Sequence, residues 1–262
     1  MGLINSDFTY SINTIGFDNL ADLGIIIESY RILDVILELN HDYQRISSYH
    51  LDYDWFLFKY KNIRVTFAVS QGAAMAVDLA ERFRVSGVKY VVRIGTIGAL
   101  ATNLNLGEFI IPYASIKDEG TSDFYIEEKS PALSDVEFTQ AISNHLRNYG
   151  HNVHNGIVWS TDGRWKESDD SIRRRVMDGA IGTDMESSAL FAFGINRRVR
   201  VASVSVLSDE ISDSGDEYKG LSDKDVWFKK VLPMMSVAFE SIVSVTNGLI
   251  EKEEGTPLDY LK

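Results

Sequence analysis

Apolar positions along the chain alternate between short runs rich in β-branched residues and longer stretches with helical spacing. The short runs predict strands in the segments ADLGIII, WFLFKY, NIRVTFAVS, VKYVVRIG, GEFIIPYA, NGIVWS, GAIGT and RVRVASVSVL. The longer stretches predict helices over residues 30–39, 72–84, 134–149, 168–178 and 225–250, and in the second half of GAIGTDMESSALFAFGI. Strands that alternate with helices predict a mostly parallel sheet that helices cover on both faces. We therefore expect a single α/β domain over residues 1–262.

Four of the predicted strands are followed by polar or glycine-rich residues. In open α/β sheets, ligands bind beyond the carboxyl ends of the strands. The four segments cover residues 93–98, 160–165, 183–186 and 208–210. They are the first candidates for a functional site.

The segment RIGTIG, residues 93–98, places a cation, glycines and a hydroxyl at the end of a predicted buried strand. Arg93 and Thr96 supply hydrogen-bond donors, and Gly95 lets the backbone approach a ligand, so the segment can cradle a phosphate or another oxyanion. A strand-ending glycine turn with a structural Arg fits the same pattern. The segment is neither a dinucleotide fingerprint nor a P-loop, because the third glycine and the Gly-Lys-Ser/Thr sequence are missing.

Acidic residues mark two further strand ends. Asp184 and Glu186 lie where a strand meets a helix, and both can complement the helix dipole as capping residues. In the alternative interpretation, Glu186 accepts hydrogen bonds from a sugar diol while Met185 packs against the apolar face of the sugar. Asp209 follows a long apolar strand and can act as a general acid if burial raises its pKa, or it can form an Asx turn.

The loop STDGRW carries an aromatic ring and a cation. Arg164 and Trp165 can stack on and hydrogen-bond to a flat heterocycle. Trp159 alternates within the preceding strand, so we expect it in the core. Trp165 is therefore the better candidate for a ligand contact.

Composition and charge exclude several classes of function. The chain has 26 Lys and Arg against 38 Asp and Glu, a formal net charge of −12, so its surface repels nucleic acid and anionic lipid. It has no Cys, which excludes disulfides, thiolate nucleophiles and iron–sulfur ligation. The five His lack metal-ligand spacing, and we expect no metal. An anionic ligand would need a local cluster of Arg or Lys to overcome the global charge.

We expect no membrane partner and a cytoplasmic location. The N-terminal segment MGLINSDFTY lacks a basic region followed by a hydrophobic stretch, and no apolar run approaches the roughly 18 residues that span a bilayer. The absence of Cys agrees with an intracellular protein.

Taken together, the motifs resemble the nucleoside phosphorylase family, which includes purine nucleoside phosphorylase, uridine phosphorylase, and the AMP and methylthioadenosine nucleosidases. The resemblance rests on VVRIGTIGAL with NLGEFIIP, DEGTSDFY, VWSTDGRW, and GTDMESSALF followed by VSVLSDE, in family order from about Gly72 to Glu210. It implies a three-layer α/β sandwich around a distorted, mostly parallel central sheet. It also implies cleavage of a nucleoside's N-glycosidic bond, usually by phosphate, in a homo-oligomer that is a dimer or a hexamer.

The residues themselves, together with the resemblance, suggest three sets of side chains for this reaction. The residues expected to bind phosphate are Arg31, Arg93, Gly95 and Thr96. Those expected to bind the ribose are Asp184, Met185 and Glu186, and those expected to bind the base are Arg164, Trp165 and Asp209. Within these groups the catalytic residues would be Arg93 and Asp209, with Asp209 protonating N7 of a purine. No cofactor is expected, since inorganic phosphate is the co-substrate.

The chain departs from the family pattern after its first strand. Family phosphorylases have a Gly-Asp-Pro-x-x-Arg loop there, whereas the segment IESYRI keeps Arg31 without the glycine loop. In the family, a neighbouring subunit typically contributes a His near its N-terminus and an Arg before the second strand. Here no His precedes His41. The candidates for the residue that the family places before the second strand are Arg45 and His50.

Several functions are therefore open. A phosphorylase that prefers purine nucleosides comes first, because Asp209 is present where pyrimidine-specific relatives usually lack an acid. The alternatives are a uridine phosphorylase, a nucleosidase that hydrolyses AMP or an adenosine-type nucleoside, and a nucleoside-binding protein without catalytic activity.

Overall fold

The computed structural model describes residues 21–38, 43–47, 54–211, 218–219 and 224–255. The strands are β1 (Leu23–Ile27), β2 (Tyr43–Ser47), β3 (Asp54–Tyr60), β4 (Ile63–Val69), β5 (Tyr90–Ala99), β6 (Phe109–Ile110), β7 (Ala114–Asp118), β8 (Ala132–Leu133), β9 (Val153–His154), β10 (Ile157–Thr161), β11 (Ala180–Asp184), β12 (Arg200–Ile211) and β13 (Tyr218–Lys219). The helices are α2 (Tyr30–Glu38), α3 (Ala73–Val85), α4 (Val136–Asn148), α5 (Asp169–Met177), α6 (Ser187–Arg197), α7 (Lys224–Val226) and α8 (Leu232–Gly255). Short 3-10 helices form η1 (Ser122–Phe124) and η2 (Arg164–Lys166), and a π-helical segment, η3 (Trp227–Val231), joins α7 to α8.

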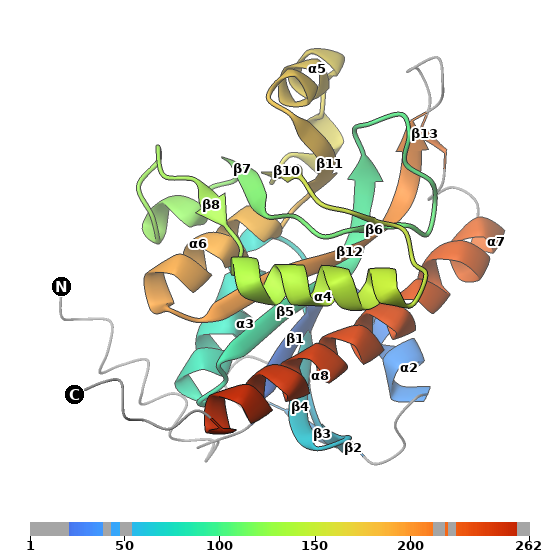
Figure 1. The fold of residues 1–262 in the computed structure, drawn as a ribbon. Coiled ribbons are helices and arrows are strands. Elements are labelled where there is room, and N and C mark those ends of the chain that lie inside the picture. Colours follow the sequence, from blue (N-terminus) through green and yellow to red (C-terminus); the bar gives the residue numbers. More distant parts are fainter. Residues whose placement is uncertain (1–20, 39–42, 48–53, 212–217, 220–223, 256–262) are drawn as a thin grey trace.

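One mixed sheet joins these strands (Figure 1). Its main path runs β2-β3-β4-β1-β5-β11-β10-β7-β8, and β12 pairs with β5, β6 and β13 off this path. At the centre, β4, β1, β5 and β12 are neighbours in parallel. The sheet is distorted where β11 pairs with the end of β5 in antiparallel direction. This is the distorted central sheet that the family resemblance implies.

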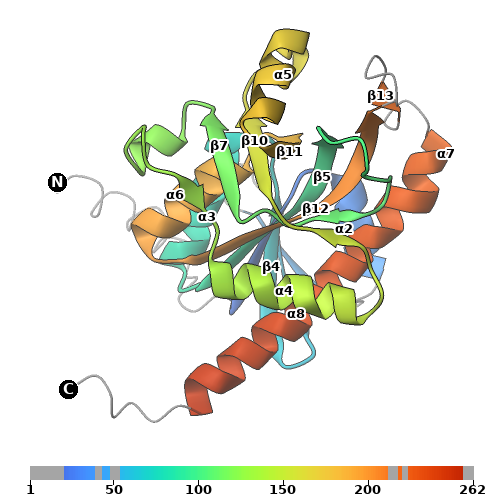
Figure 2. The same ribbon diagram turned by 45° about the horizontal axis from the view of Figure 1, so that its top comes forward.

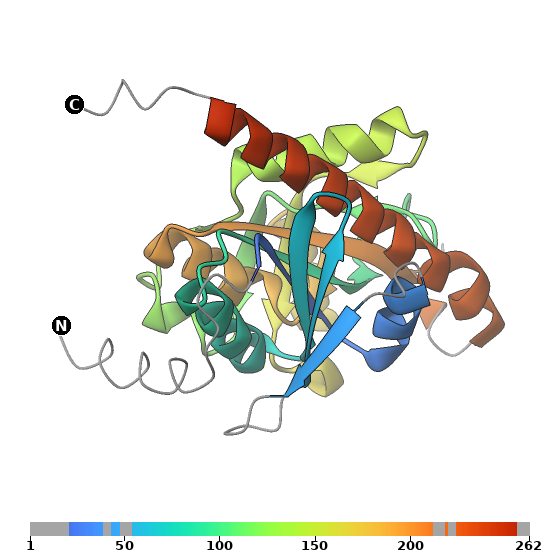
Figure 3. The same ribbon diagram turned by 90° about the horizontal axis from the view of Figure 1, so that it is seen from below.

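Helices cover both faces of the central strands, so strands such as β1 are buried along their whole length (Figure 3). Successive side chains of a strand point to opposite faces of the sheet. Accordingly, Ile25 and Val92 pack in one core cluster with α2, α4 and α8, whereas Ile26 and Val91 pack in another with α3 and α6. The predicted three-layer α/β architecture is confirmed.

The glycines of residues 93–98 do not end a strand, so the predicted strand-ending glycine loop is wrong. β5 continues through them to Ala99. Gly98 pairs with Thr183 of β11 on one side and with Asp209 of β12 on the other. Two ladders therefore hold this backbone extended, and the segment acts through its side chains and its lack of bulk.

The predicted strand GEFIIPYA is two strands in the structure. β6 pairs with β12 and β9, whereas β7 pairs with β10 and β8. Pro112 lies between them and has no N–H group to donate to a ladder. The chain changes partners at that residue.

The C-terminal helix corrects one expectation about membranes. The segment Trp227–Glu253 is long and apolar enough to cross a membrane by length and composition. Many of its apolar side chains, among them Met235, Phe239 and Ile242, are buried in the core against the sheet, whereas Phe228 is 49% exposed. Packing in the core layer accounts for the buried part of this apolar character.

Candidate active site

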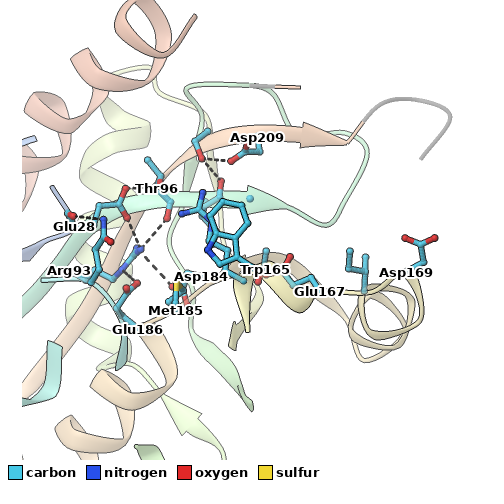
Figure 4. Close-up of a pocket in the computed structure, with 17 residues that line it drawn as sticks. Glu28, Arg93, Thr96, Trp165, Glu167, Asp169, Asp184, Met185, Glu186 and Asp209 are labelled. Carbon is cyan, nitrogen blue, oxygen red and sulfur yellow. Dashed lines mark hydrogen bonds and ion pairs between the residues drawn. The ribbon is translucent and has the colours of Figure 1, made fainter. Parts of the chain in front are cut away.

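A cavity of about 540 Å³ lies at the edge of the sheet where β1, β4, β5, β11 and β12 end (Figure 4). This volume is within the range of roughly 300–1,000 Å³ typical of small-molecule sites. The cavity is lined by parts of all four segments that the sequence singled out: Arg93 with Thr96 to Gly98, Arg164 and Trp165, Thr183 to Glu186, and Ser208 and Asp209. The η2 turn and the start of α5 form its outer wall.

Arg93 lies at the inner end of the cavity, 3% exposed, with its guanidinium hydrogen-bonded in several directions. Its Nε donates to Oε2 of Glu186 at 2.8 Å, and its Nη1 donates to Oγ of Ser205 at 2.9 Å. Its Nη2 donates to Oε2 of Glu28 and to the carbonyl oxygen of Thr96, each at 3.1 Å. Side chains and a carbonyl group of the protein itself thus accept the hydrogen bonds of the guanidinium that sequence analysis assigns to an anion.

Three carboxylates of the described residues surround this one guanidinium, those of Glu28, Asp184 and Glu186. Burial by itself would lower the pKa of Arg93, but Glu186, Asp184 and Glu28 raise it above its ordinary value. Burial also raises the pKa of Glu186, and Asp184 and Glu28 add to that effect while Arg93 opposes it. The cluster carries more negative than positive charge when its groups are ionised.

Glu186 does not cap α6, although it occupies the N-cap position. Its Oε1 accepts a hydrogen bond from the backbone N–H of Gly72 at 2.7 Å, and its Oε2 faces Arg93. Asp184 takes the capping role instead, because its carboxylate accepts from the backbone N–H and the hydroxyl of Ser187. The capping interpretation therefore holds for Asp184 and not for Glu186. The contact of Glu186 with a sugar diol stays a prediction.

A network of hydroxyls beneath the cavity holds the junction between β11 and α6 in place. Ser160 donates to Asp184 at 2.5 Å and accepts from the backbone N–H of Ser188 at 3.0 Å. Ser115 contacts the Ser160 hydroxyl at 2.9 Å, and the Ser188 hydroxyl donates to Glu119 at 2.8 Å. Sequence analysis missed this network, whose signal is a serine on each of the neighbouring strands β7 and β10.

Asp209 lies at the outer end of the cavity, partly buried. A β-bulge shifts the register of β12 between Leu207 and Asp209, and such bulges re-aim side chains. The Ser208 hydroxyl donates to Oδ2 of Asp209 at 2.7 Å. The bulge and this hydrogen bond place the carboxylate on the wall opposite η2.

Trp165 and Arg164 belong to η2 on that opposite wall. The Trp165 side chain is 88% exposed, and the Arg164 guanidinium lies 5.3 Å from the centre of its ring. Glu167, which sequence analysis missed, also lines this end. Burial raises the pKa of Glu167, Arg164 opposes that shift, and Asp209 adds to it. Its position two residues after Trp165 was the available signal.

Glu28 is the most informative residue that sequence analysis missed. It follows β1 directly, in the segment IESYRI where the chain departs from the family pattern. The hydroxyl of Thr96 donates to its Oε1 at 2.6 Å, and the side-chain amide of Gln71 donates to its backbone carbonyl at 2.9 Å. Glu28, Arg93 and Thr96 therefore form one hydrogen-bonded group (Figure 4).

The structure does not bring Arg31 to this group. Arg31 is exposed on α2, with its guanidinium 6.0 Å and 5.8 Å from the ring centres of Trp227 and Phe228. His41 and His50 lie outside the described residues, and Arg45 is described only as backbone of β2. Gly95 lies beside Glu28 and Arg93, and Met185 lines the cavity next to Glu186.

Comparison with known proteins points to one family. The profile of the phosphorylase superfamily matches residues 22–243 of the chain. A uridine phosphorylase from Thermococcus kodakarensis is 32% identical over 123 residues, which cover 46% of this chain and 44% of that protein. A guanosine phosphorylase from Halorubrum lacusprofundi is 26% identical over 152 residues, which cover 55% of this chain and 62% of that protein. The chain thus spans about half the length of the curated relatives it matches.

A solved structure shares the fold over nearly the whole chain. The crystal structure of a uridine phosphorylase from Vibrio fischeri superposes with a TM-score of 0.73 at 23% identity, and covers 91% of this chain and 95% of that one. At this identity the likeness concerns the fold alone.

Proposed function

The chain belongs to the phosphorylase superfamily, and on that premise we propose that it cleaves the N-glycosidic bond of a nucleoside with phosphate, releasing the free base and ribose 1-phosphate. The observation that supports the proposal is the arrangement of one cavity, in which four separate segments bring the buried guanidinium of Arg93 and the carboxylates of Glu186 and Asp209 around a common space. Such convergence of polar groups in a cavity is typical of catalytic sites.

The arrangement supports a specific division of labour. Arg93 and Thr96 bind phosphate, while Glu186 accepts hydrogen bonds from the ribose hydroxyls and Met185 packs on the sugar. Phosphate attacks C1′ as the ribosyl group acquires oxocarbenium character, and the site contributes by holding both reactants in line. Asp209 protonates the departing base, which avoids release of an anionic leaving group.

We propose a purine as the base, because Asp209 lines the cavity and a carboxyl group there would give a proton to an acceptor such as N7. Uracil is the alternative base, and two of the similar proteins named above are uridine phosphorylases. Arg164 and Trp165 line the same end and would stack on either type of ring.

Hydrolysis by water is the second candidate, and one observation favours it. The carboxylate of Glu28 takes the donors of Arg93 and Thr96 that phosphate would use. A nucleosidase would need no phosphate in that place.

Assay of base release with and without phosphate tests these candidates. Inosine, adenosine, uridine, methylthioadenosine and AMP are incubated separately with the full chain, and free base is measured by chromatography. We expect release from purine nucleosides that depends on phosphate. Release that does not depend on phosphate would replace phosphorolysis with hydrolysis, and no release from any substrate would favour a binding protein.

We further propose that the chain works as a cytoplasmic homo-oligomer, a dimer or a hexamer, and that it needs no cofactor beyond phosphate. Sedimentation equilibrium tests the oligomeric state, and a monomer at micromolar concentration would contradict it. Full activity after exhaustive dialysis against a chelator is the result expected for an enzyme without a metal.

A further inference from the structure

The carboxylate of Glu28 makes the contacts that the sequence assigns to phosphate. One oxygen lies 3.1 Å from Nη2 of Arg93, and the other lies 2.6 Å from the hydroxyl of Thr96. A carboxylate that bridges a guanidinium and a hydroxyl in this way forms two charge-assisted hydrogen bonds, as two oxygens of a phosphate would. The chain therefore carries an anion of its own at this position.

The Glu28 carboxylate also fills the space beside Arg93, in addition to taking its hydrogen-bond donors. A Cβ atom added to Gly95 would lie 2.6 Å from Oε2 of Glu28 and 2.7 Å from Cζ of Arg93, closer than van der Waals contact allows. Gly95 lies within β5 and has no positive φ, so its lack of a side chain serves this close approach. A second anion has no room against the β5 backbone while Glu28 is in place.

The remaining donors of Arg93 are already engaged. Its Nε faces Glu186, and its Nη1 faces Ser205 with Asp184 3.9 Å away. The two N–H groups of Nη2 face Glu28 and the carbonyl oxygen of Thr96. A phosphate anion that entered beside Glu28 would also meet like charge at short range, where repulsion is strong in a buried site. Phosphate and the Glu28 carboxylate are therefore mutually exclusive occupants.

We propose that Glu28 is a specificity-determining residue that competes internally with phosphate, so that phosphate binds to Arg93 and Thr96 only when the Glu28 carboxylate leaves. The side chain of Glu28 is 17% exposed and lines the cavity, which gives the carboxylate a route into the open space. The inference rests on the proposed function only in taking Arg93 and Thr96 as the phosphate site. Its direct consequence is that removal of the Glu28 charge strengthens phosphate binding.

Calorimetric titration of the full chain with inorganic phosphate, in the absence of nucleoside, tests the inference. We expect Glu28→Gln to lower the Kd for phosphate at least tenfold, equivalent to about 1.4 kcal/mol. The matched control is Glu38→Gln, the same chemical change on the exposed end of α2, which should leave the Kd as in the wild type. An unchanged Kd in Glu28→Gln, or no detectable phosphate binding by that variant, overturns the inference.

A second variant and a second readout keep the result unambiguous. Circular dichroism reports whether Glu28→Gln folds, and Glu28→Ala, which removes the carboxylate and opens space, carries the same expectation if it does not. If Glu28→Gln binds phosphate more tightly while neither the wild type nor the variants release base, the inference stands and the proposed function is removed. Base release that is lost in Glu28→Gln while the phosphate Kd stays constant would instead place Glu28 in the chemical step and overturn the inference.

Discussion

The two ends of the cavity are built in opposite ways. At the inner end, Arg93 and Glu186 come from the buried strand β5 and the β11–α6 junction, and their polar atoms are matched by fixed partners. At the outer end, Trp165 is 88% exposed on a short 3-10 turn, and α5 stands out from the body of the molecule beside it (Figure 2). In Figure 4 most of the dashed interactions gather around Arg93, whereas the side chains of Glu167 and Asp169 stand apart from that group.

The difference separates what the site holds rigidly from what it can adapt. Most of this buried network keeps its geometry, because displacing Glu186 or Arg93 leaves a buried charge without its partner. Glu28, whose side chain is 17% exposed, is the member that we propose can leave. An exposed aromatic ring on a loop has neighbours on few sides and can adjust to different flat ligands. We infer that the inner end is preorganised for the sugar and the reaction centre, whereas the outer end tolerates more than one base.

Removal of Arg93 should have the largest effect, because it removes the guanidinium around which three carboxylates gather at the inner end. Arg93→Ala leaves Glu28, Asp184 and Glu186 crowded together, and we expect a loss of about 3–5 kcal/mol in the free energy of unfolding, as for other broken buried pairs. Urea denaturation measures this, with exposed Arg174→Ala on α5 as control. A loss below about 1 kcal/mol would show that the carboxylates do not depend on Arg93.

Substitution of Asp209 tests whether the outer end supplies a proton. If Asp209 is the general acid, Asp209→Asn should lower kcat for purine nucleosides by about 10²–10⁴-fold, because the amide cannot give a proton to the base. Steady-state rates of base release measure this, with Asp170→Asn on the exposed first turn of α5 as control. Unchanged purine turnover would remove that role from Asp209.

Removal of the Trp165 ring should affect binding but not folding. Since the ring is almost fully exposed, Trp165→Ala should change the free energy of unfolding by less than about 0.5 kcal/mol. Loss of aromatic stacking should raise KM for the nucleoside by about threefold to tenfold, with kcat nearly constant. A cooperative loss of stability in this variant would contradict the contrast between the two ends.

The smallest effect concerns the pH dependence of stability at the outer end. Burial raises the pKa of Glu167 from its ordinary value of 4.5, with Arg164 opposing and Asp209 adding to the shift. A raised pKa means that the folded protein holds this proton more tightly than the unfolded chain does. The resulting stability is full below the ordinary pKa and is lost as the pH rises through the raised one.

As the pH falls from neutral to about pH 4, protonation of Glu167 should add to the free energy of unfolding of the wild-type protein. Glu167→Gln should lose this contribution, which is about 0.5 kcal/mol or less. Urea denaturation at several pH values measures the two profiles. Wild-type and variant profiles that run parallel across this range would show that Glu167 does not titrate abnormally.

Most of the fold could be predicted from the sequence because its signals are local. The run LGIII of β1 is a continuous apolar strand, and such runs are covered on both faces. Ser168 starts α5 with a capping box to Ser171, close to where the helical spacing places its beginning. The errors lie where the neighbouring strands determine how far a strand extends, at the glycines of β5 and on either side of Pro112.

The candidate site was predicted as four separate segments, and most of its residues line one cavity. Arg31 and Glu28 are the informative exceptions. They lie three positions apart in the sequence, yet Arg31 packs near aromatic rings of the C-terminal region while Glu28 contacts Arg93. A helix that starts at Tyr30 turns the two side chains in different directions, and no local pattern reports which one faces the cavity.

The sequence by itself determined the layers, the order of the main elements and the kinds of chemical group at the strand ends, since these follow from hydrophobic period and residue type. The tertiary structure alone decided which groups share a hydrogen bond. Arg93 and Glu186 are separated by 93 positions, and Glu28 reaches Arg93 across 65. Whether the buried guanidinium is free for phosphate or is held by a carboxylate depends on how β1, β5 and β11 pair, because side chains meet only where neighbouring strands end together.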